Sequence, residues 1–305
     1  QRLRSLAAGR TAVIGVPYLW LLAFFLLPFL IVARISVAEM ENVTFKDLLS
    51  FKDGLLQLTL RFTGYQFIIE DSLYFDAYLR SVKYAAATTV LCLAIGYPFA
   101  YFMARARTAI QPALLMLVML PFWTSFLLRV YAWKGLLSEG GWIESVIVGA
   151  GLDRLLFAAG LIEAEGRLMN TPFSLVLGMV YTYLPFMVLP LYANLAKMDL
   201  RLLEAAADLG ATPWTAFWRI TVPLSKAGII AGSMLVFIPC VGEFVIPELL
   251  GGPRTLMIGR VMWDEFFSNN DWPMASSVAV VMVLLIIVPL AIFNKYQAEA
   301  QEARR

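Results

Sequence analysis

Long stretches without a charged residue constrain this chain more than any other feature of its sequence. Residues 11–33, 84–104, 108–128, 168–196 and 272–294 contain no Asp, Glu, Lys or Arg, and a sixth such stretch covers residues 227–242. A bilayer core of about 30 Å needs about 20 apolar residues in a helix. With the sixth stretch continued to residue 249, the sequence predicts an all-α polytopic membrane protein with six transmembrane helices.

The composition supports a membrane protein and argues against several other classes. The 305 residues are 60% hydrophobic and 15% charged, whereas a soluble domain carries about 25% charged residues. The net charge of +2 gives no reason to expect nucleic-acid binding. We expect Cys92 and Cys240, which lie in apolar stretches, to act as small hydrophobic residues. The first stretch has a long apolar core and no small-residue cleavage site after it, so we expect it to be retained.

The residue types present give no reason to expect an enzyme. The chain has no histidine, which is the commonest metal ligand and the commonest general base. It also lacks the Gly-x-x-x-x-Gly-Lys-[Ser/Thr] motif that cradles nucleotide phosphates. We therefore expect no catalytic residues, no metal site and no cofactor in this chain.

The placement of Lys and Arg predicts the orientation in the membrane. Segments 1–12, 104–111, 197–226 and 295–305 together hold 12 Lys and Arg in 61 residues, whereas segments 36–76, 138–171 and 250–274 hold 7 in 100 residues. Positive charge concentrates on the cytoplasmic side, so we expect both termini there. The outer loops (36–76, 138–171 and 250–271) are acidic, and we expect short helices in the first two.

One cytoplasmic segment, residues 199–224, predicts two short helices instead of a simple polar loop. Asp199 is a plausible N-cap for a helix through Leu209, and Gly210 suits the left-handed residue that ends it. Thr212 is a plausible N-cap for a second helix with Pro213 at its first position, and we expect that helix to stop before Pro223. A unit of this size cannot bury its apolar side chains, such as Leu203, Trp214 and Trp218, against one another. We therefore expect the membrane surface, this chain's own helices or a partner protein to cover them.

The spacing of this segment resembles the coupling loop of permease subunits of ATP-binding-cassette importers. The shared pattern here consists of Glu204, Ala205, Ala206, Gly210, Ile220 and Pro223, with Val222 where the family usually has leucine. The resemblance implies a type I importer permease fold, with residues 1–305 as one transmembrane domain. It also implies that residues 199–224 dock on a separate ATPase subunit, which binds ATP and magnesium.

Four further stretches resemble the polyamine permeases of bacterial importers. They are PYLWLLAFFLLPFLIV (17–32), PFWTSFLLRVYAWKGLL (121–137), YLPFMVLPLYANL (183–195) and GEFVIPELLGGP (242–253). The resemblance is nearest to the first permease of the putrescine branch, followed by the spermidine-preferring branch. It implies a bacterial inner-membrane protein that takes up putrescine or spermidine with a second permease, two ATPase copies and a periplasmic binding protein.

The chemistry of a polyamine suggests which residues would line its path. A flexible polycation with methylene spacers favours carboxylates between aromatic walls. Glu243 and Glu248 lie at the end of the fifth predicted span, where a charge is costly and usually functional. Trp123, Tyr131 and Tyr183 are candidates for cation–π contacts. The structural alternative is that Glu243 or Glu248 pairs with Arg129, and much of the selectivity could reside in the binding protein.

Two alternative functions differ in what they require of the sequence. A permease of the same superfamily for another substrate class would share the coupling loop but match the four stretches less well. An ion-coupled secondary transporter would show an internal repeat with broken helices in both halves, and the two halves of this chain show no clear repeat. The sequence therefore favours a polyamine importer permease.

Overall fold

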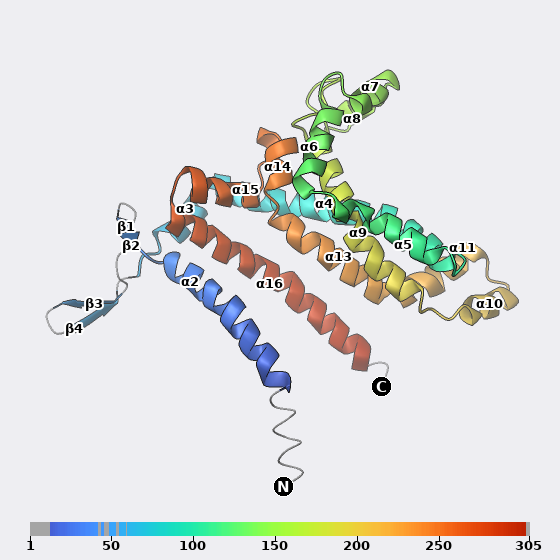
Figure 1. Cartoon of the computed structure of the whole chain (residues 1–305), viewed down its shortest axis with the longest axis horizontal. Helices are drawn as coiled ribbons and strands as arrows, with labels where there is room; N and C mark the ends of the chain where they lie inside the picture. The colour runs from blue at the N-terminus through green and yellow to red at the C-terminus, as the bar shows by residue number, and fades with distance from the viewer. Residues whose placement is uncertain (1–12, 42–43, 46–48, 53–54, 59, 303–305) are drawn as a thin grey trace, which may run out of the picture. The chain divides into compact units, whose positions relative to one another are not determined.

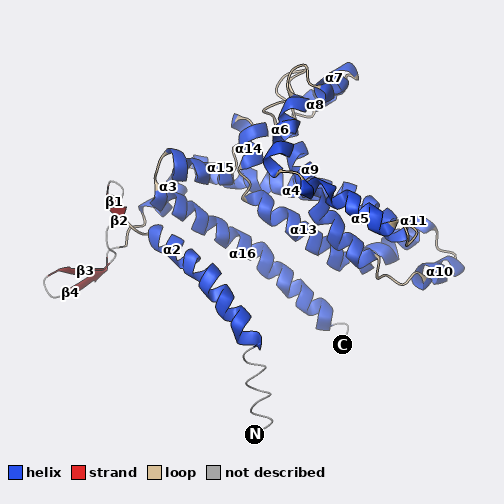
Figure 2. Ribbon diagram, viewed as in Figure 1, coloured by secondary structure: helices blue, strands red, loops and turns tan. Residues whose placement is uncertain are grey.

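The computed structural model describes residues 13–41, 44–45, 49–52, 55–58 and 60–302, and these residues are mainly helical (Figures 1 and 2). They form two compact units, one made of residues 1–75 and 262–285 and one made of residues 76–261 and 286–305. The basic segment 1–12 and the end of the C-terminal tail, both used above to predict orientation, lie outside the described residues.

The first unit begins with an apolar helix over Val13–Ile35, which widens into a π-turn over Leu22–Leu26 and continues as α2 (Leu27–Ile35). Helix α3 (Thr63–Glu70) approaches the start of α16 (Trp272–Glu302) closely. A Cβ atom on Gly64 would lie 2.6 Å from the Ser277 hydroxyl oxygen. That hydroxyl donates to the carbonyl oxygen of Ser36 at 3.1 Å, which ties α16 to the end of α2.

The first outer loop differs from the expectation of short helices alone. Residues between α2 and α3 form two antiparallel hairpins, β1 (Met40–Glu41) with β2 (Thr44–Phe45) and β3 (Leu49–Lys52) with β4 (Leu55–Leu58). Helix α3 then gives the expected helical part. The sequence from 49 to 58 has apolar residues on both sides of Asp53-Gly54, and an Asp-Gly pair between such runs is typical of a two-residue hairpin turn.

The second unit contains the remaining helices. In chain order they are α4 (Ser72–Arg105, which begins in the first unit), α5 (Gln111–Met119), a 3-10 helix (Leu120–Trp123), α6 (Phe126–Leu137), α7 (Trp142–Gly149), α8 (Leu152–Ala158), α9 (Pro172–Leu195), α10 (Arg201–Asp208), α11 (Pro213–Ala216), a π-turn (Phe217–Thr221), α12 (Val222–Leu224), α13 (Lys226–Val241), α14 (Val245–Leu250), a 3-10 helix (Pro253–Thr255) and α15 (Ile258–Trp263). In the first unit, a further π-turn covers Asp264–Ser268 before α16. Helices α7 and α8 confirm the expected helices of the second outer loop.

By length and composition, the described residues provide three helices that could cross a membrane, or up to five if each of two bent helix pairs forms one span, against the six predicted. Val13–Ile35, α4 and α9 are each long and apolar enough to cross a bilayer. Two bent helix pairs, Gln111–Trp123 with α6 and Pro213–Leu224 with α13, pass the same test only as pairs, with bends of 87° and 64°. The apolar start of α16, Trp272–Ile287, coincides with the sixth predicted span.

Helices α9 and α13 pack directly on each other in the middle of the second unit (Figure 1). Gly228 and Gly232 of α13 make this approach possible, because an added Cβ would lie 2.8 Å from the Asn194 Cβ and 2.8 Å from the Met187 sulfur. Small residues spaced four apart allow two helices to approach closely. The glycine pair therefore serves the packing of this chain on itself.

Candidate functional site

The segment 199–224 folds into two short helices that meet at Gly210. Helix α10 ends in a Schellman motif, in which the N–H of Ala211 donates to the Ala206 carbonyl and that of Gly210 to the Ala207 carbonyl, both at 2.9 Å. Gly210 has φ +80°, a left-handed conformation that favours glycine. Asp199 lies one residue ahead of the N-cap, Leu200, and its carboxylate accepts from the Arg201 N–H at 3.0 Å.

The second helix begins as expected but does not stop where expected. The Thr212 hydroxyl accepts from the Thr215 N–H at 3.3 Å, and Pro213 occupies the first turn. The expected stop before Pro223 was wrong. A π-turn over Phe217–Thr221 widens the helix, which continues through Pro223 to Leu224 and bends into α13 at Ser225. The wide turn lets the chain pass a residue that has no N–H to donate.

The predicted coupling residues divide into an outward and an inward set. Glu204, Ala205, Gly210 and Pro223 are exposed, Ile220 is half-buried, and Ala206 is buried. Trp214 and Trp218 are 71% and 53% exposed. Helix α10 thus turns Ala206 toward this chain and leaves the face with Glu204 and Ala205 uncovered.

Aromatic contacts attach this segment to α4. The Phe217 ring makes edge-to-face contacts with Tyr97 and Tyr101, at centroid distances of 5.6 and 5.9 Å. The Tyr97 and Ser225 hydroxyls are 2.8 Å apart and share a hydrogen bond. The segment is therefore fixed to the helix core on one side while its other side is open.

The second candidate site is the break between α13 and α14, where Glu243 lies. The Glu243 side chain is 9% exposed. One carboxylate oxygen accepts the Tyr183 hydroxyl of α9, and the other accepts the N–H groups of Phe244 and Val245 at 3.2 and 3.0 Å. A helix N-terminus has unpaired N–H groups and a partial positive charge, so this carboxylate stabilises the start of α14.

Helix α9 holds α14 at its other end as well. The Ser174 hydroxyl donates to the Leu250 carbonyl at 2.6 Å. Gly178 lies between these two contacts, and a Cβ there would come within 2.5 Å of the Leu250 side chain. Helix α15 closes the same break, because a Cβ on Gly259 would lie 2.5 Å from the Gly242 carbonyl oxygen and 2.6 Å from that of Glu243.

Glu248 has a different environment from Glu243. Its side chain is 52% exposed and forms an ion pair with Arg260 of α15, with 2.7 Å between Oε2 and Nε. The alternative pairing with Arg129 was wrong, since neither glutamate reaches that residue. The Arg129 guanidinium lies 5.9 Å from the Phe122 and Phe126 ring centroids, and its Nε and Nη1 have no hydrogen-bond partner within the described parts of the chain.

The three predicted aromatic residues do not form one wall. Tyr183 is buried and bound to Glu243, whereas Trp123 and Tyr131 are 70% and 55% exposed on either side of the bend before α6. Helix α14 does pack on both α6 and α9, so the elements that carry Tyr131, Tyr183 and Glu248 adjoin one another.

Sequence reasoning missed the residues that complete the second site. These residues lie far along the chain from their partners. Ser174 is 76 positions from Leu250, Arg260 is 12 positions from Glu248, and Gly259 is 16 positions from Glu243. Ser174 carried a local signal, because the Thr171-Pro172-Phe173-Ser174 sequence forms a capping box at the start of α9. No local pattern indicates the pairing of Tyr183 with Glu243. Within the described residues, no group of three His, Cys, Asp or Glu could hold a metal ion.

Comparison with known proteins gives sequence relatives that cover most of the chain. The spermidine/putrescine transport system permease protein PotB of Escherichia coli is 36% identical over 274 residues, which are 90% of this chain and 92% of that protein. The protein of the same name from Haemophilus influenzae is 36% identical over 285 residues, 93% of this chain and 92% of its own length.

Comparison with solved structures supports the fold. A chain of a bacterial ATP-binding-cassette transporter involved in the import of the acidic polysaccharide alginate superposes with a TM-score of 0.61 at 15% identity, over 97% of this chain and 98% of that one. Residues 92–300 match the family model of the binding-protein-dependent transport system inner membrane component. The chain therefore belongs to this family of inner-membrane importer permeases.

Proposed function

We propose that this chain is a permease subunit of an ATP-driven importer of putrescine, spermidine or both. The observation that carries the substrate assignment is the 36% identity to spermidine/putrescine permeases over nine-tenths of the chain. The exposed face of α10 supports the importer assignment, because Glu204 and Ala205 have no cover within the second unit. An ion-coupled transporter would have no use for such a segment.

The coupling role belongs to residues 199–224. Ala205 allows a partner surface to approach closely, and Glu204 offers it a charge-assisted hydrogen bond. Gly210 sets the angle between α10 and α11. Ile220 and Pro223 join the segment to α13 through the π-turn, so a force on α10 reaches a membrane-spanning helix.

The coupling role of residues 199–224 implies several partner proteins. Because the sequence lacks the Gly-x-x-x-x-Gly-Lys-[Ser/Thr] motif, we infer that ATP with magnesium binds two copies of a separate ATPase subunit, one of which docks on α10. A second permease forms the other half of the pathway, and a periplasmic polyamine-binding protein delivers the substrate. The chain spans the bacterial inner membrane several times, with both termini and residues 199–224 in the cytoplasm.

The environments of the predicted pathway residues support different roles for them. Glu248 is half-exposed although it pairs with Arg260, so its carboxylate remains accessible to the polycation. Trp123 and Tyr131 offer exposed aromatic faces for its methylenes and ammonium groups. Glu243 and Tyr183 act as positioning residues that fix the start of α14.

Uptake in cells tests this function directly. The chain and its neighbouring gene products would be expressed in a bacterial host without its own polyamine importers, and uptake of labelled putrescine and spermidine measured. We expect uptake to saturate, to require ATP, and to stop when the partner ATPase is omitted. Normal uptake without any ATPase would overturn the importer assignment. ATP-dependent uptake of another solute, with no polyamine uptake, would overturn the substrate class.

A further inference from the structure

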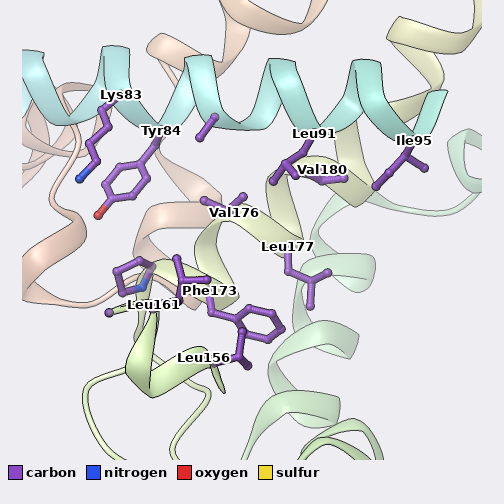
Figure 3. A pocket seen from close by; sticks show the side chains of 14 residues that line it. Lys83, Tyr84, Leu91, Ile95, Leu156, Leu161, Phe173, Val176, Leu177 and Val180 are labelled. Carbon is purple, nitrogen blue, oxygen red and sulfur yellow. The ribbon is translucent and has the colours of Figure 1, made fainter. Parts of the chain in front are cut away.

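A largely apolar cavity of about 460 Å³ lies between α4, α9 and the end of α8, away from both sites described above (Figure 3). Its volume is in the range of small-molecule sites, which is about 300–1,000 Å³. Leu91 and Ile95 line it from α4, Leu156 from α8, and Phe173 and Val176 from α9. None of the fourteen lining residues is acidic.

The cavity follows α4 for the depth of one leaflet. Its lining on this helix runs from Lys83 to Ile95, and twelve residues of α-helix rise about 18 Å. Half of a bilayer core is about 15 Å. Lys83 directly precedes the uncharged stretch that begins at Tyr84, so the cavity starts at the expected headgroup level and extends into the hydrocarbon region.

The headgroup end of the cavity carries two hydrogen-bond donors. Figure 3 shows the Lys83 and Tyr84 side chains next to each other on the cavity side of α4. The Lys83 amino nitrogen is 5.9 Å from the centroid of the Tyr84 ring. No ion pair to Lys83 and no hydrogen bond from the Tyr84 hydroxyl forms with any residue that the structure describes. Both groups are therefore free to bind an anion.

We propose that this cavity holds one acyl chain of an anionic phospholipid, whose phosphate binds the Lys83 amino group and the Tyr84 hydroxyl. An apolar channel of leaflet depth fits an acyl chain, and a cation at its headgroup end favours an anionic lipid. In the proposed orientation this lipid belongs to the outer leaflet. A polyamine does not fit the site, because it would meet a positive charge and no carboxylate.

Native mass spectrometry of the assembled importer tests the proposal, with phosphatidylglycerol and phosphatidylcholine titrated separately. We expect the wild-type complex to bind one phosphatidylglycerol at this site about fivefold more tightly than phosphatidylcholine, since a Lys near an anionic membrane surface contributes about 1 kcal/mol. Lys83→Gln should remove this preference while an acyl chain still binds. Lys134→Gln, which changes an exposed lysine of α6 outside the cavity lining, should leave it unchanged.

A second variant tests the acyl-chain part of the cavity independently of charge. Val176→Trp places a large ring among the lining side chains and should abolish binding of both lipids at this site, while the variant still copurifies with the ATPase. Retention of lipid by Val176→Trp would overturn the proposal, and so would equal affinity of the wild type for the two lipids. Cross-linking from Ala159→Cys to the second permease, without bound lipid, would show a subunit interface there and would also overturn it.

Discussion

Segment 199–224 and the break between α13 and α14 use their glutamates in opposite ways. Glu243 is buried, and both of its carboxylate oxygens bind groups of this chain. Glu204 is exposed on a short helix that buries Ala206 and half-buries Leu203. The two regions lie at opposite ends of α13 (Figure 1), a helix of 16 residues and thus about 24 Å long.

The comparison separates residues that hold the chain together from residues that are available to a partner. A buried charge needs hydrogen bonds to persist, and Glu243 has them from α9 and from the start of α14. An exposed charge on an uncovered face gains little from its own chain. The contrast predicts that substitutions at 204 damage assembly, whereas substitutions at 243 damage the fold of the break.

The largest expected effect is from Glu204→Lys. Removal of one member of a charged contact between subunits costs about 2–5 kcal/mol, so we expect ATP-driven uptake to fall by more than tenfold and the ATPase to be lost on copurification. The protein should reach the membrane in normal amount. Asp208→Lys is the matched charge reversal on α10 and should have a small effect, because a cation suits the last turn of a helix. Normal uptake by Glu204→Lys would contradict the coupling role.

Gly210→Asp tests the geometry of the same segment without altering Glu204. A side chain at φ +80° strains the turn by about 1 kcal/mol or more, and α10 would meet its partner at another angle. We expect copurification with the ATPase to weaken and uptake to fall several-fold. Gly149→Asp, at a glycine of α7 with no atom within 4 Å of an added Cβ, serves as the control and should retain both properties.

Tyr183→Phe tests the other region. It removes a donor to a buried carboxylate, and a hydrogen bond to a charged group contributes about 1.5–3 kcal/mol, so the unfolding temperature of the purified protein should fall. Glu243→Gln should lower it too. Because both residues position α14, we expect each to reduce the maximal uptake rate with little change in the polyamine concentration at half-maximal rate.

Two further results would sharpen the assignment of Glu243. Tyr18→Phe, an exposed tyrosine of the first helix, should change neither stability nor uptake. A large increase in the half-saturating polyamine concentration with Glu243→Gln, and none with Tyr183→Phe, would show instead that Glu243 binds the substrate directly.

Gly232→Ala tests the helix that joins the two regions. An added methyl group would meet the Met187 sulfur at 2.8 Å and the Met187 carbonyl oxygen at 3.1 Å, and overpacking of this kind costs about 1–3 kcal/mol. We expect a lower unfolding temperature. Gly135→Ala, in α6 with no atom within 4 Å of an added Cβ, should be neutral or slightly stabilising. Equal stability of the two variants would mean that α9 and α13 do not pack as described.

The smallest expected effect is from Glu248→Gln. Glu248 remains half-exposed in its ion pair. An ion pair near the surface contributes about 0.2–1 kcal/mol, and a contact of Glu248 with a polyamine ammonium group should be of similar size. We expect the half-saturating polyamine concentration to rise up to fivefold at unchanged stability. Glu163→Gln is the matched control, because Glu163 pairs with Arg254 at 3.4 Å and is also partly exposed. Equal responses of the two variants would remove Glu248 from the proposed path.

Much of the fold could be predicted because its signals are local. The apolar stretches mark the helices that are long enough to span a membrane, and Gly210, Thr212 and Pro213 mark the turn between α10 and α11. Pro223 misled, because proline usually ends a helix and nothing in the sequence announces the π-turn that accommodates it. Local sequence signals thus predict where helices form, but they do not predict that a helix continues through a proline.

The contacts within the candidate site could not be predicted, because they depend on how helices rotate against one another. Glu243 and Tyr183 are 60 positions apart, and both were selected only as residues of suitable type. Arg129 was the ionic partner in the structural alternative, yet its guanidinium lies near two phenylalanine rings and Glu248 pairs with Arg260. Residue type and spacing suggest which groups matter, while the helix packing decides which of them meet.

The contact of Gly259 with the break has a mechanical consequence. The backbone of α15 at Gly259 packs against the carbonyl groups of Gly242 and Glu243 with no room for a methyl group between them. The Tyr183 hydroxyl binds the Glu243 side chain at the same break. Neither α13 nor α14 can rotate at this break unless α15 moves as well. A movement of α13 would therefore displace α15, and with it the outer loop of residues 250–271.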